Sequence, residues 1–263
     1  MRSRCNDIEV AWHEAGRGDP LILIHGLADD HRAWRRAVPD LMLHHRLLMY
    51  DLRGHGETSL GAADGTLRQL GDDLVTLLDA IEVERADIAG FSLGGTIAMR
   101  VAIDHPDRAR GIALVATSSR VGHSAAGWYR ERAEMVERND PHLRDTLDKD
   151  TADVYAESPS ELEGGLLIRR QSTEDSRGYG NACAAMAGLN ANPLDPELPR
   201  ISAPTLIVAS ELDRHCPPKA AEVIASGIRG SKLEVMRGAG HPIPVEKPRE
   251  LASSINSFLA ELG

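Results

Sequence analysis

The amino-acid sequence predicts an α/β fold, a mostly parallel, doubly wound sheet with an inserted helical cap. Short apolar runs alternate with helical patterns in both halves of the chain, which is typical of parallel βαβ units. This rhythm stops between about residues 119 and 200, where the sequence is helical and has no convincing strand. We therefore expect a core of residues 1–118 and 201–263, and a cap of residues 119–200 over the carboxyl ends of the strands.

The predicted strands of the first half fall into two kinds. Ile8–Ala15 alternates loosely between apolar and polar residues, so we expect an edge strand there. The later strands are continuous apolar runs, as expected when helices cover both faces of a sheet. These buried strands are Pro20–His25, Leu47–Tyr50, Ala86–Ala89 and Ile112–Ala116.

Helical patterns separate these strands. Trp34, Val38 and Leu41 have helical spacing, and Thr66 with Gln69 forms a capping box that opens an amphipathic helix reaching Ile81. In the expected cap, the candidate helices are Trp128–Asn139, Asp145–Tyr155, Ser160–Gln171 and Thr173–Leu189. The chain then returns to the core pattern with Thr205–Ala209, Pro218–Ile228, Lys232–Met236 and Arg249–Leu262.

The pentapeptide Gly90-Phe91-Ser92-Leu93-Gly94 stands between a predicted strand and the predicted helix Leu93–Ile103. A strand that turns into a helix within two residues forces the central residue into strained backbone angles. We expect the Ser92 Cβ to crowd the positions two residues before and after it, which explains why glycine occupies both, as Gly90 and Gly94. This turn would hold the Ser92 oxygen clear of the sheet, at a helix N-terminus where the Leu93 amide can stabilise an anion. Ser92 is therefore the candidate nucleophile.

A nucleophilic serine needs a base and a carboxylate that orients the base. In elbows of this kind the acid and then the histidine follow the serine along the chain. Asp213 follows the strand Thr205–Ala209, and His241 follows the last strand, so both should lie on loops at the sheet edge of Ser92. We assign Asp213 as the acid in preference to Glu211, which lies nearer the strand end. His215 is assigned a place on the surface or the pocket rim.

An oxyanion hole should combine the amide of Leu93 with that of Leu27, in the loop after the strand Pro20–His25. His25 is expected to brace this loop through hydrogen bonds. Asp51, Arg53 and His55 occupy a glycine-rich loop, and we interpret them as a turn held by its own hydrogen bonds.

Composition narrows the function classes. The 263 residues carry a formal net charge of −10, with an isoelectric point near 5.6, which argues against nucleic acid and anionic membranes as partners. No signal-like or membrane-spanning apolar stretch is present, so we expect a cytoplasmic protein. The three cysteines are too scattered for a disulfide framework, and the histidines lack metal-ligand spacing. We expect no metal and no cofactor, and a homodimer is compatible with these observations.

Several motifs together resemble the α/β-hydrolase superfamily over residues 8–118 and 201–262. They are Gly90-Phe91-Ser92-Leu93-Gly94-Gly95, His25-Gly26 with Trp34 beyond, Asp51-x-Arg53-Gly54-x-Gly56, Asp213 with Pro217, and Gly240-His241 with Glu246 and Pro248. Thr58 departs mildly from the usual serine. The resemblance implies a hydrolase but leaves the bond open, since members cleave esters, lactones, amides, epoxides, carbon–halogen and some carbon–carbon bonds.

Two features narrow the resemblance. Ser92 stands where dehalogenases and epoxide hydrolases have aspartate, and Phe91 stands where carbon–carbon bond hydrolases usually have asparagine. The segment from Gly178 to Ala185 is similar to one in 3-oxoadipate enol-lactonases. We therefore expect a serine hydrolase acting on a carboxylic ester or lactone through an acyl-enzyme. The alternatives are a cofactor-free haloperoxidase or perhydrolase-like esterase, a carbon–carbon bond hydrolase, and a small-molecule receptor with the hydrolase fold.

Phe91, Trp128, Arg169 and Arg170 are the candidates for substrate contact. Arg169 and Arg170 adjoin a helix end in the predicted cap, and Arg177 precedes the lactonase-like segment. For any one of the three arginines the simpler interpretation is a solvated side chain. The alternative hypothesis is that at least one faces the pocket, where its guanidinium group could pair with a substrate carboxylate.

Overall fold

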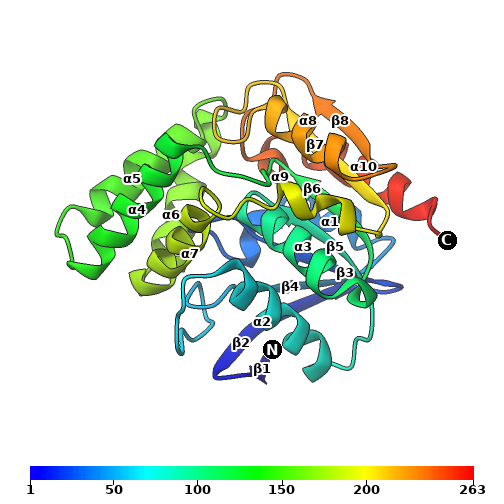
Figure 1. The fold of residues 1–263 in the computed structure, drawn as a ribbon, viewed down its shortest axis with the longest axis horizontal. Coiled ribbons are helices and arrows are strands. Elements are labelled where there is room, and N and C mark those ends of the chain that lie inside the picture. Colours follow the sequence, from blue (N-terminus) through cyan, green and yellow to red (C-terminus); the bar gives the residue numbers. More distant parts are fainter.

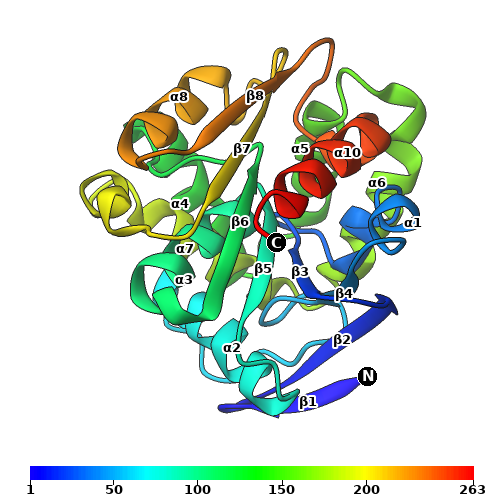
Figure 2. The ribbon, with the colours of Figure 1, turned by 90° about the vertical axis from the view of Figure 1, so that its right-hand side faces the viewer.

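The structure is a computed structural model that describes all residues from Met1 to Gly263. Eight strands form one sheet in the order β1-β2-β4-β3-β5-β6-β7-β8, which runs through the molecule (Figure 1, Figure 2). Strands β3 to β8 are parallel to one another, whereas β2 is antiparallel to both of its neighbours. The strands are β1 (Arg2–Cys5), β2 (Ile8–Gly16), β3 (Pro20–Ile24), β4 (Arg46–Tyr50), β5 (Ala86–Phe91), β6 (Ala109–Val115), β7 (Thr205–Ser210) and β8 (Lys232–Met236).

Helices cover both faces of this sheet, which confirms the predicted doubly wound α/β class. The α-helices are α1 (Val38–Leu41), α2 (Leu67–Ala80), α3 (Leu93–Asp104), α4 (His123–Glu137), α5 (Leu143–Val154), α6 (Leu162–Ser172), α7 (Ser176–Gly188), α8 (Pro218–Gly227), α9 (Ile243–Glu246) and α10 (Pro248–Ala260). Short 3₁₀ helices are η1 (His31–Trp34), η2 (Pro106–Arg108), η3 (Pro159–Glu161) and η4 (Asp195–Arg200). None of these helices is both long and apolar enough to cross a membrane.

The period-two alternation of strand side chains explains why the central strands are apolar throughout. In β3, Ile22 and Ile24 enter the core cluster under α2, α3 and α8. Leu21 and Leu23 enter the other cluster, which lies under α1 and α10. Because the side chains of each central strand pack into two buried layers, the position of its carboxyl end is fixed. The start of the following loop is fixed with it.

The prediction that Ile8–Ala15 forms an edge strand is wrong. β2 lies inside the sheet, because β1 pairs with it antiparallel and takes the edge. The two strands are joined by a two-residue turn in which Asn6 has φ = 54°, a conformation that asparagine tolerates better than most residues. β1 is polar and short, so it has no hydrophobic pattern that would predict a strand. The expected helix through Trp34 and Leu41 is also divided, into η1 and α1.

Helices α4 to α7 lie together on one side of the molecule, at the left in Figure 1. They occur within the segment 119–200 that the sequence predicts to be helical, although α4 begins at His123 rather than Trp128. α4, α5 and α7 share a small apolar cluster, which comprises Ala28, Met135, Val136, Leu143, Leu147, Tyr179 and Cys183. One member, Ala28, comes from the loop after β3.

α7 approaches the loop after β4 so closely that neither chain has room for a side chain. A Cβ atom on Gly178 would overlap the carbonyl group of Gly54, and a Cβ on Gly54 would overlap the Gly178 Cα. These two glycines therefore fix the distance between α7 and the core of the sheet.

Replacement of Gly178 by alanine tests this contact. We expect Gly178→Ala to lower the free energy of unfolding by about 1–3 kcal/mol, because two backbones must separate. Gly188 on the same helix is the control, since nothing lies within 4 Å of its added Cβ. Gly188→Ala should be neutral, or stabilising by up to about 1 kcal/mol. Urea unfolding of both variants makes the measurement, and equal effects would contradict the close-packing assignment.

Candidate active site

Ser92 lies between the end of β5 and the start of α3, in a conformation that few residues adopt. Its backbone has φ = 53° and ψ = −118°. The Ser92 N–H donates to the carbonyl of Val115 at 2.9 Å, and the Thr117 hydroxyl donates to the Ser92 carbonyl at 2.7 Å. Strained residues persist only where surrounding contacts determine the backbone. Here the end of β6 and the loop that follows it supply those contacts.

The glycines around Ser92 allow three segments to meet. A Cβ atom on Gly90 would overlap the Gly94 carbonyl, and a Cβ on Gly94 would overlap the carbonyl of Ile24. Gly94 is therefore needed because α3 begins against the end of β3, and this contact replaces the expected crowding by the Ser92 Cβ. A Cβ on Gly26 would lie 3.3 Å from the Ser92 Cβ, so the loop after β3 passes directly beside the serine.

His241 and Asp213 reach Ser92 from the loops after β8 and β7. The His241 Nε2 lies 3.1 Å from the Ser92 Oγ. On the other side of the ring, Nδ1 lies 2.8 Å from the Asp213 Oδ2. All three expected residues thus form one chain of hydrogen-bonding contacts. Asp213 and His241 are buried.

The remaining oxygen of Asp213 is also held. Its Oδ1 accepts the backbone N–H groups of His215 and Cys216, each at 2.8 Å. Burial opposes ionisation of this carboxyl group, but His241 and these amides outweigh burial and lower its pKa below the ordinary value. Glu211 faces away, because its carboxylate accepts the Gly238 N–H at 2.9 Å. The geometry therefore agrees with Asp213 as the partner of His241.

A cavity of about 640 Å³ opens beside Ser92, between the strand-end loops and helices α4 to α7. Its volume is within the range typical of small-molecule sites. Phe91 and Trp128 both line it, as expected. His215 also lines it, with its ring centre 5.0 Å from that of His241, and burial lowers the His215 pKa. Sequence patterns did not single out Tyr129 and Tyr179, which contribute to the wall.

Two backbone amides adjoin the serine. The Leu93 N–H is at the first position of α3, where no preceding turn supplies a carbonyl acceptor. The Leu27 N–H donates to no acceptor within the protein. Leu27 lines the cavity and directly follows Gly26, the residue packed against Ser92. Both amides that were expected as donors thus have no acceptor within the protein.

The three arginines have different surroundings from one another. Arg169 lines the cavity, but its guanidinium group is paired with Asp29, with Nε 3.0 Å from Oδ1. The prediction that Arg170 contacts substrate is wrong, because its side chain is exposed and pairs with Asp148 on the surface, outside the cavity lining. Arg177 is likewise exposed and pairs with Asp175. The helical turn of α6 points successive side chains in different directions, which separates Arg169 from Arg170.

Hydrogen bonds join the glycine-rich loop after β4 to the loop after β3. The His25 Nε2 accepts the Leu52 N–H at 2.9 Å, and its Nδ1 contacts the Gly26 carbonyl at 2.8 Å. His25 thus braces two loops, as expected. Arg53 is buried and bonds both carboxylate oxygens of Asp73, at 2.8 and 2.6 Å.

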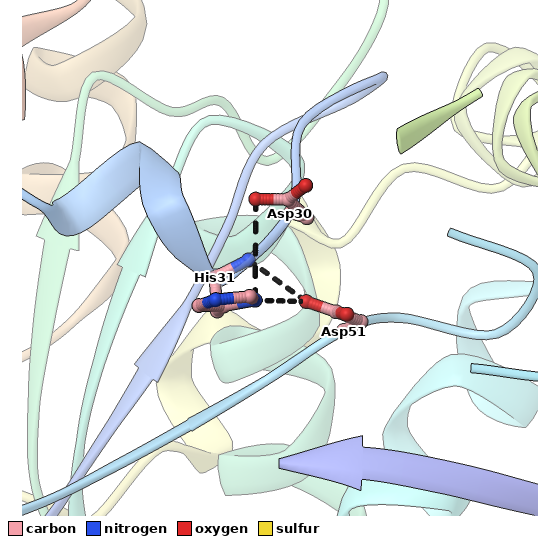
Figure 3. Close-up of side chains that lie close together, drawn as sticks. All are labelled: Asp30, His31 and Asp51. Atoms are coloured by element: carbon pink, nitrogen blue, oxygen red, sulfur yellow. Dashed lines mark hydrogen bonds and ion pairs between the residues drawn. The ribbon is translucent and has the colours of Figure 1, made fainter. Parts of the chain in front are cut away.

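Asp30, His31 and Asp51 form a cluster that sequence spacing did not predict (Figure 3). The His31 Nδ1 and backbone N–H both contact the Asp51 Oδ1, at 2.7 and 2.9 Å. Asp30 is bonded instead by the backbone N–H and guanidinium group of Arg32. Because each side chain has a protein partner, we interpret the cluster as a tie between η1 and the loop after β4.

The arrangement supplies the parts required for covalent catalysis of acyl transfer. An activated hydroxyl group, a histidine that can exchange its proton and a carboxylate that orients the histidine are in contact. Two free amides beside the serine can stabilise negative charge on a substrate oxygen. The sequence could identify these groups individually, whereas their distances come from the fold.

Comparisons with known proteins agree with this geometry. A sequence model described as the alpha/beta hydrolase fold matches residues 19–248. The 3-oxoadipate enol-lactonase 1 of Acinetobacter baylyi is 29% identical over 245 residues, which cover 92% of this chain and 89% of that protein. The 2-hydroxymuconate semialdehyde hydrolase of a Pseudomonas species is 27% identical over 267 residues, with coverages of 97% and 91%. The crystal structure of the enol-lactonase from Burkholderia xenovorans has a TM-score of 0.88 at 26% identity, covering 99% of this chain and 100% of that chain.

His55, in the glycine-rich loop after β4, predicts how the free energy of unfolding depends on pH. Burial lowers the pKa of His55 to about 4, while the unfolded residue titrates near 6.5. Between these values the unfolded chain binds a proton that the folded chain excludes. His55 therefore makes the free energy of unfolding fall by up to about 1.4 kcal/mol per pH unit as the pH drops from 6.5 to 4. Urea titrations across this range should give His55→Gln a shallower slope than wild type. Identical slopes would mean that His55 does not stay neutral in the folded protein.

Proposed function

The chain belongs to the alpha/beta hydrolase fold family, and on that premise we propose that it is a serine hydrolase that cleaves a carboxylic ester or lactone. The observation that carries this proposal is the contact chain from Ser92 through His241 to Asp213 at the cavity wall. The similarity to proteins named 3-oxoadipate enol-lactonase and enol-lactonase supports the lactone as a substrate class.

In the first half of the reaction, the Ser92 Oγ attacks the substrate carbonyl carbon while His241 Nε2 takes the hydroxyl proton. The carbonyl oxygen becomes an oxyanion and receives hydrogen bonds from the Leu27 and Leu93 amides. Asp213 keeps the Nδ1 proton of His241 directed away from the serine and stabilises the imidazolium ion. As the intermediate collapses, His241 returns its proton to the leaving oxygen, and an acyl group remains on Ser92.

In the second half, water replaces the leaving group. His241 takes a proton from the water as its oxygen attacks the acyl carbon, and then protonates the Ser92 Oγ as the acyl bond breaks. An ester gives an alcohol and a carboxylic acid. A lactone gives one product, because its leaving oxygen stays attached to the acyl group.

Residues 119–200 serve in this proposal as a cap that closes the substrate cavity. Phe91 from β5 and Trp128 from α4 supply apolar contact surface to the wall. The cavity volume of about 640 Å³ is suited to a small-molecule substrate.

The competing function is hydrolysis of a carbon–carbon bond, which the relative named 2-hydroxymuconate semialdehyde hydrolase brings forward. A panel of p-nitrophenyl esters of increasing chain length, several lactones and a vinylogous 1,5-diketone separates the two. Turnover of short esters and lactones supports the proposal. Turnover of the diketone with little ester hydrolysis would replace it.

Removal of the nucleophile is the first test. Ser92→Ala should lower kcat by about 10⁴-fold or more, because the acyl group then has no acceptor on the enzyme. Alanine fits the elbow without new contacts, so the circular dichroism spectrum should match wild type. Covalent labelling by an organophosphonate, followed by mass spectrometry, makes the measurement. A labelled Ser92→Ala protein would place the nucleophile on another residue.

The second test separates the two acidic residues of the loop after β7. Asp213→Asn keeps the side-chain volume but lets His241 adopt the wrong tautomer, so kcat should fall on the order of 10⁴-fold. Glu211→Gln is the matched control and should leave kcat within a few-fold of wild type. Steady-state kinetics on one short ester compares them. A larger loss in Glu211→Gln would make Glu211 the acid.

A further inference from the structure

The loop that carries the Leu27 amide is attached to helix α6. The Arg169 Nε lies 3.0 Å from the Asp29 Oδ1, and the Arg169 Nη2 lies 3.4 Å from Oδ2 and 3.3 Å from the Leu27 carbonyl. Both partners are nearly inaccessible, with 11% of the Arg169 side chain and 6% of the Asp29 side chain exposed. A buried ion pair of this kind holds its partners firmly, because separation would leave two uncompensated charges.

A second contact joins the same two segments one turn further along α6. The Ser172 hydroxyl donates to the Asp29 carbonyl. The Ser172 carbonyl in turn accepts the Gly56 N–H at 2.9 Å, from the loop after β4. The last turn of α6 therefore contacts the Leu27–Asp29 loop through its side chains, and the loop after β4 through its backbone.

The loop itself requires such support. Ala28 has φ = 64°, a left-handed conformation that costs about 1–2 kcal/mol for a residue other than glycine. Its methyl group packs into the apolar cluster of α4, α5 and α7. The loop thus lies between the serine on one side and the helices of residues 119–200 on the other.

We propose that Arg169 is a positioning residue that holds the Leu27 amide in place as an oxyanion donor through Asp29 and the Leu27 carbonyl. This inference rests on the proposed function, in which the Leu27 amide binds the oxyanion. It assigns Arg169 a role different from substrate recognition, because the Nε and Nη2 groups are occupied by the protein. It also makes the oxyanion hole dependent on α6, so the site is complete only when that helix is seated.

The test uses Arg169→Met and Asp29→Asn, which remove the pair from either side, and Arg170→Met as the control. Arg170 neighbours Arg169 on α6 but pairs with Asp148 on the surface. On a neutral p-nitrophenyl ester, we expect both pair variants to lose about 10–100-fold in kcat with KM within threefold of wild type. The double variant should be no worse than the poorer single one, and Arg170→Met should equal wild type.

A second readout reports on the oxyanion itself. The probe is a trifluoromethyl ketone with ¹³C at its carbonyl carbon. The Ser92 oxygen adds to that carbon and forms a hemiketal without loss of any group. The ¹³C shift then follows ionisation of the hemiketal hydroxyl. We expect the pH midpoint of this ionisation to move upward by at least one pH unit in Arg169→Met and Asp29→Asn, because a displaced Leu27 amide stabilises the oxyanion less. Arg170→Met should keep the wild-type midpoint.

The outcomes distinguish the two proposals. Unchanged kcat and hemiketal midpoint in both pair variants would overturn the role of Arg169 while leaving the serine hydrolase intact. A raised KM with unchanged kcat and midpoint would also overturn it, by moving Arg169 to substrate contact. Absence of ester turnover and hemiketal formation in the wild type would overturn the proposed function itself. If Arg169→Met does not fold, the isosteric Asp29→Asn variant decides the question through the same midpoint.

Discussion

The site depends on one steric constraint, the approach of α3 to the ends of β3 and β5. α3 starts immediately after Ser92, and its first turn has room only because Gly94 adjoins the Ile24 carbonyl without a side chain. The same proximity places the loop after β3 beside the serine through Gly26. The strand order brings together the loops that follow β3, β5 and β6, because these strands are neighbours in the sheet and end at the same edge.

The constraint is electrostatic as well as steric. Ser92, the Asp213 loop and the His241 loop meet at the carboxyl ends of parallel strands, where backbone amides of the following segments are free to bind anions. Asp213 uses two such amides, and the proposed oxyanion hole uses two others. Fixed dipoles of this kind need no rearrangement when charge develops, which is the basis of their effect on a reaction.

Sequence reasoning succeeded where the chemistry is local and stopped where it depends on distant partners. The alternation of apolar runs and helical patterns predicted the sheet, and the elbow around Ser92 with the order of Asp213 and His241 predicted which groups would meet. The pairing of Arg169 with Asp29 was outside its reach, because 140 positions separate them and no sequence pattern links the two residues. β1 was missed for a related reason, since its pairing with β2 is backbone hydrogen bonding that polar side chains conceal.

The place of Ala28 among the side chains of α4, α5 and α7 has a consequence for protein engineering. Helices α4 to α7 form one continuous stretch between β6 and β7, so they could be exchanged as a single segment. This segment does not complete its own apolar cluster, because Ala28 from the loop after β3 is part of that cluster. A chimera that imports another helical segment would have to bring a complement for Ala28 and Asp29, or the graft would be designed together with the loop after β3.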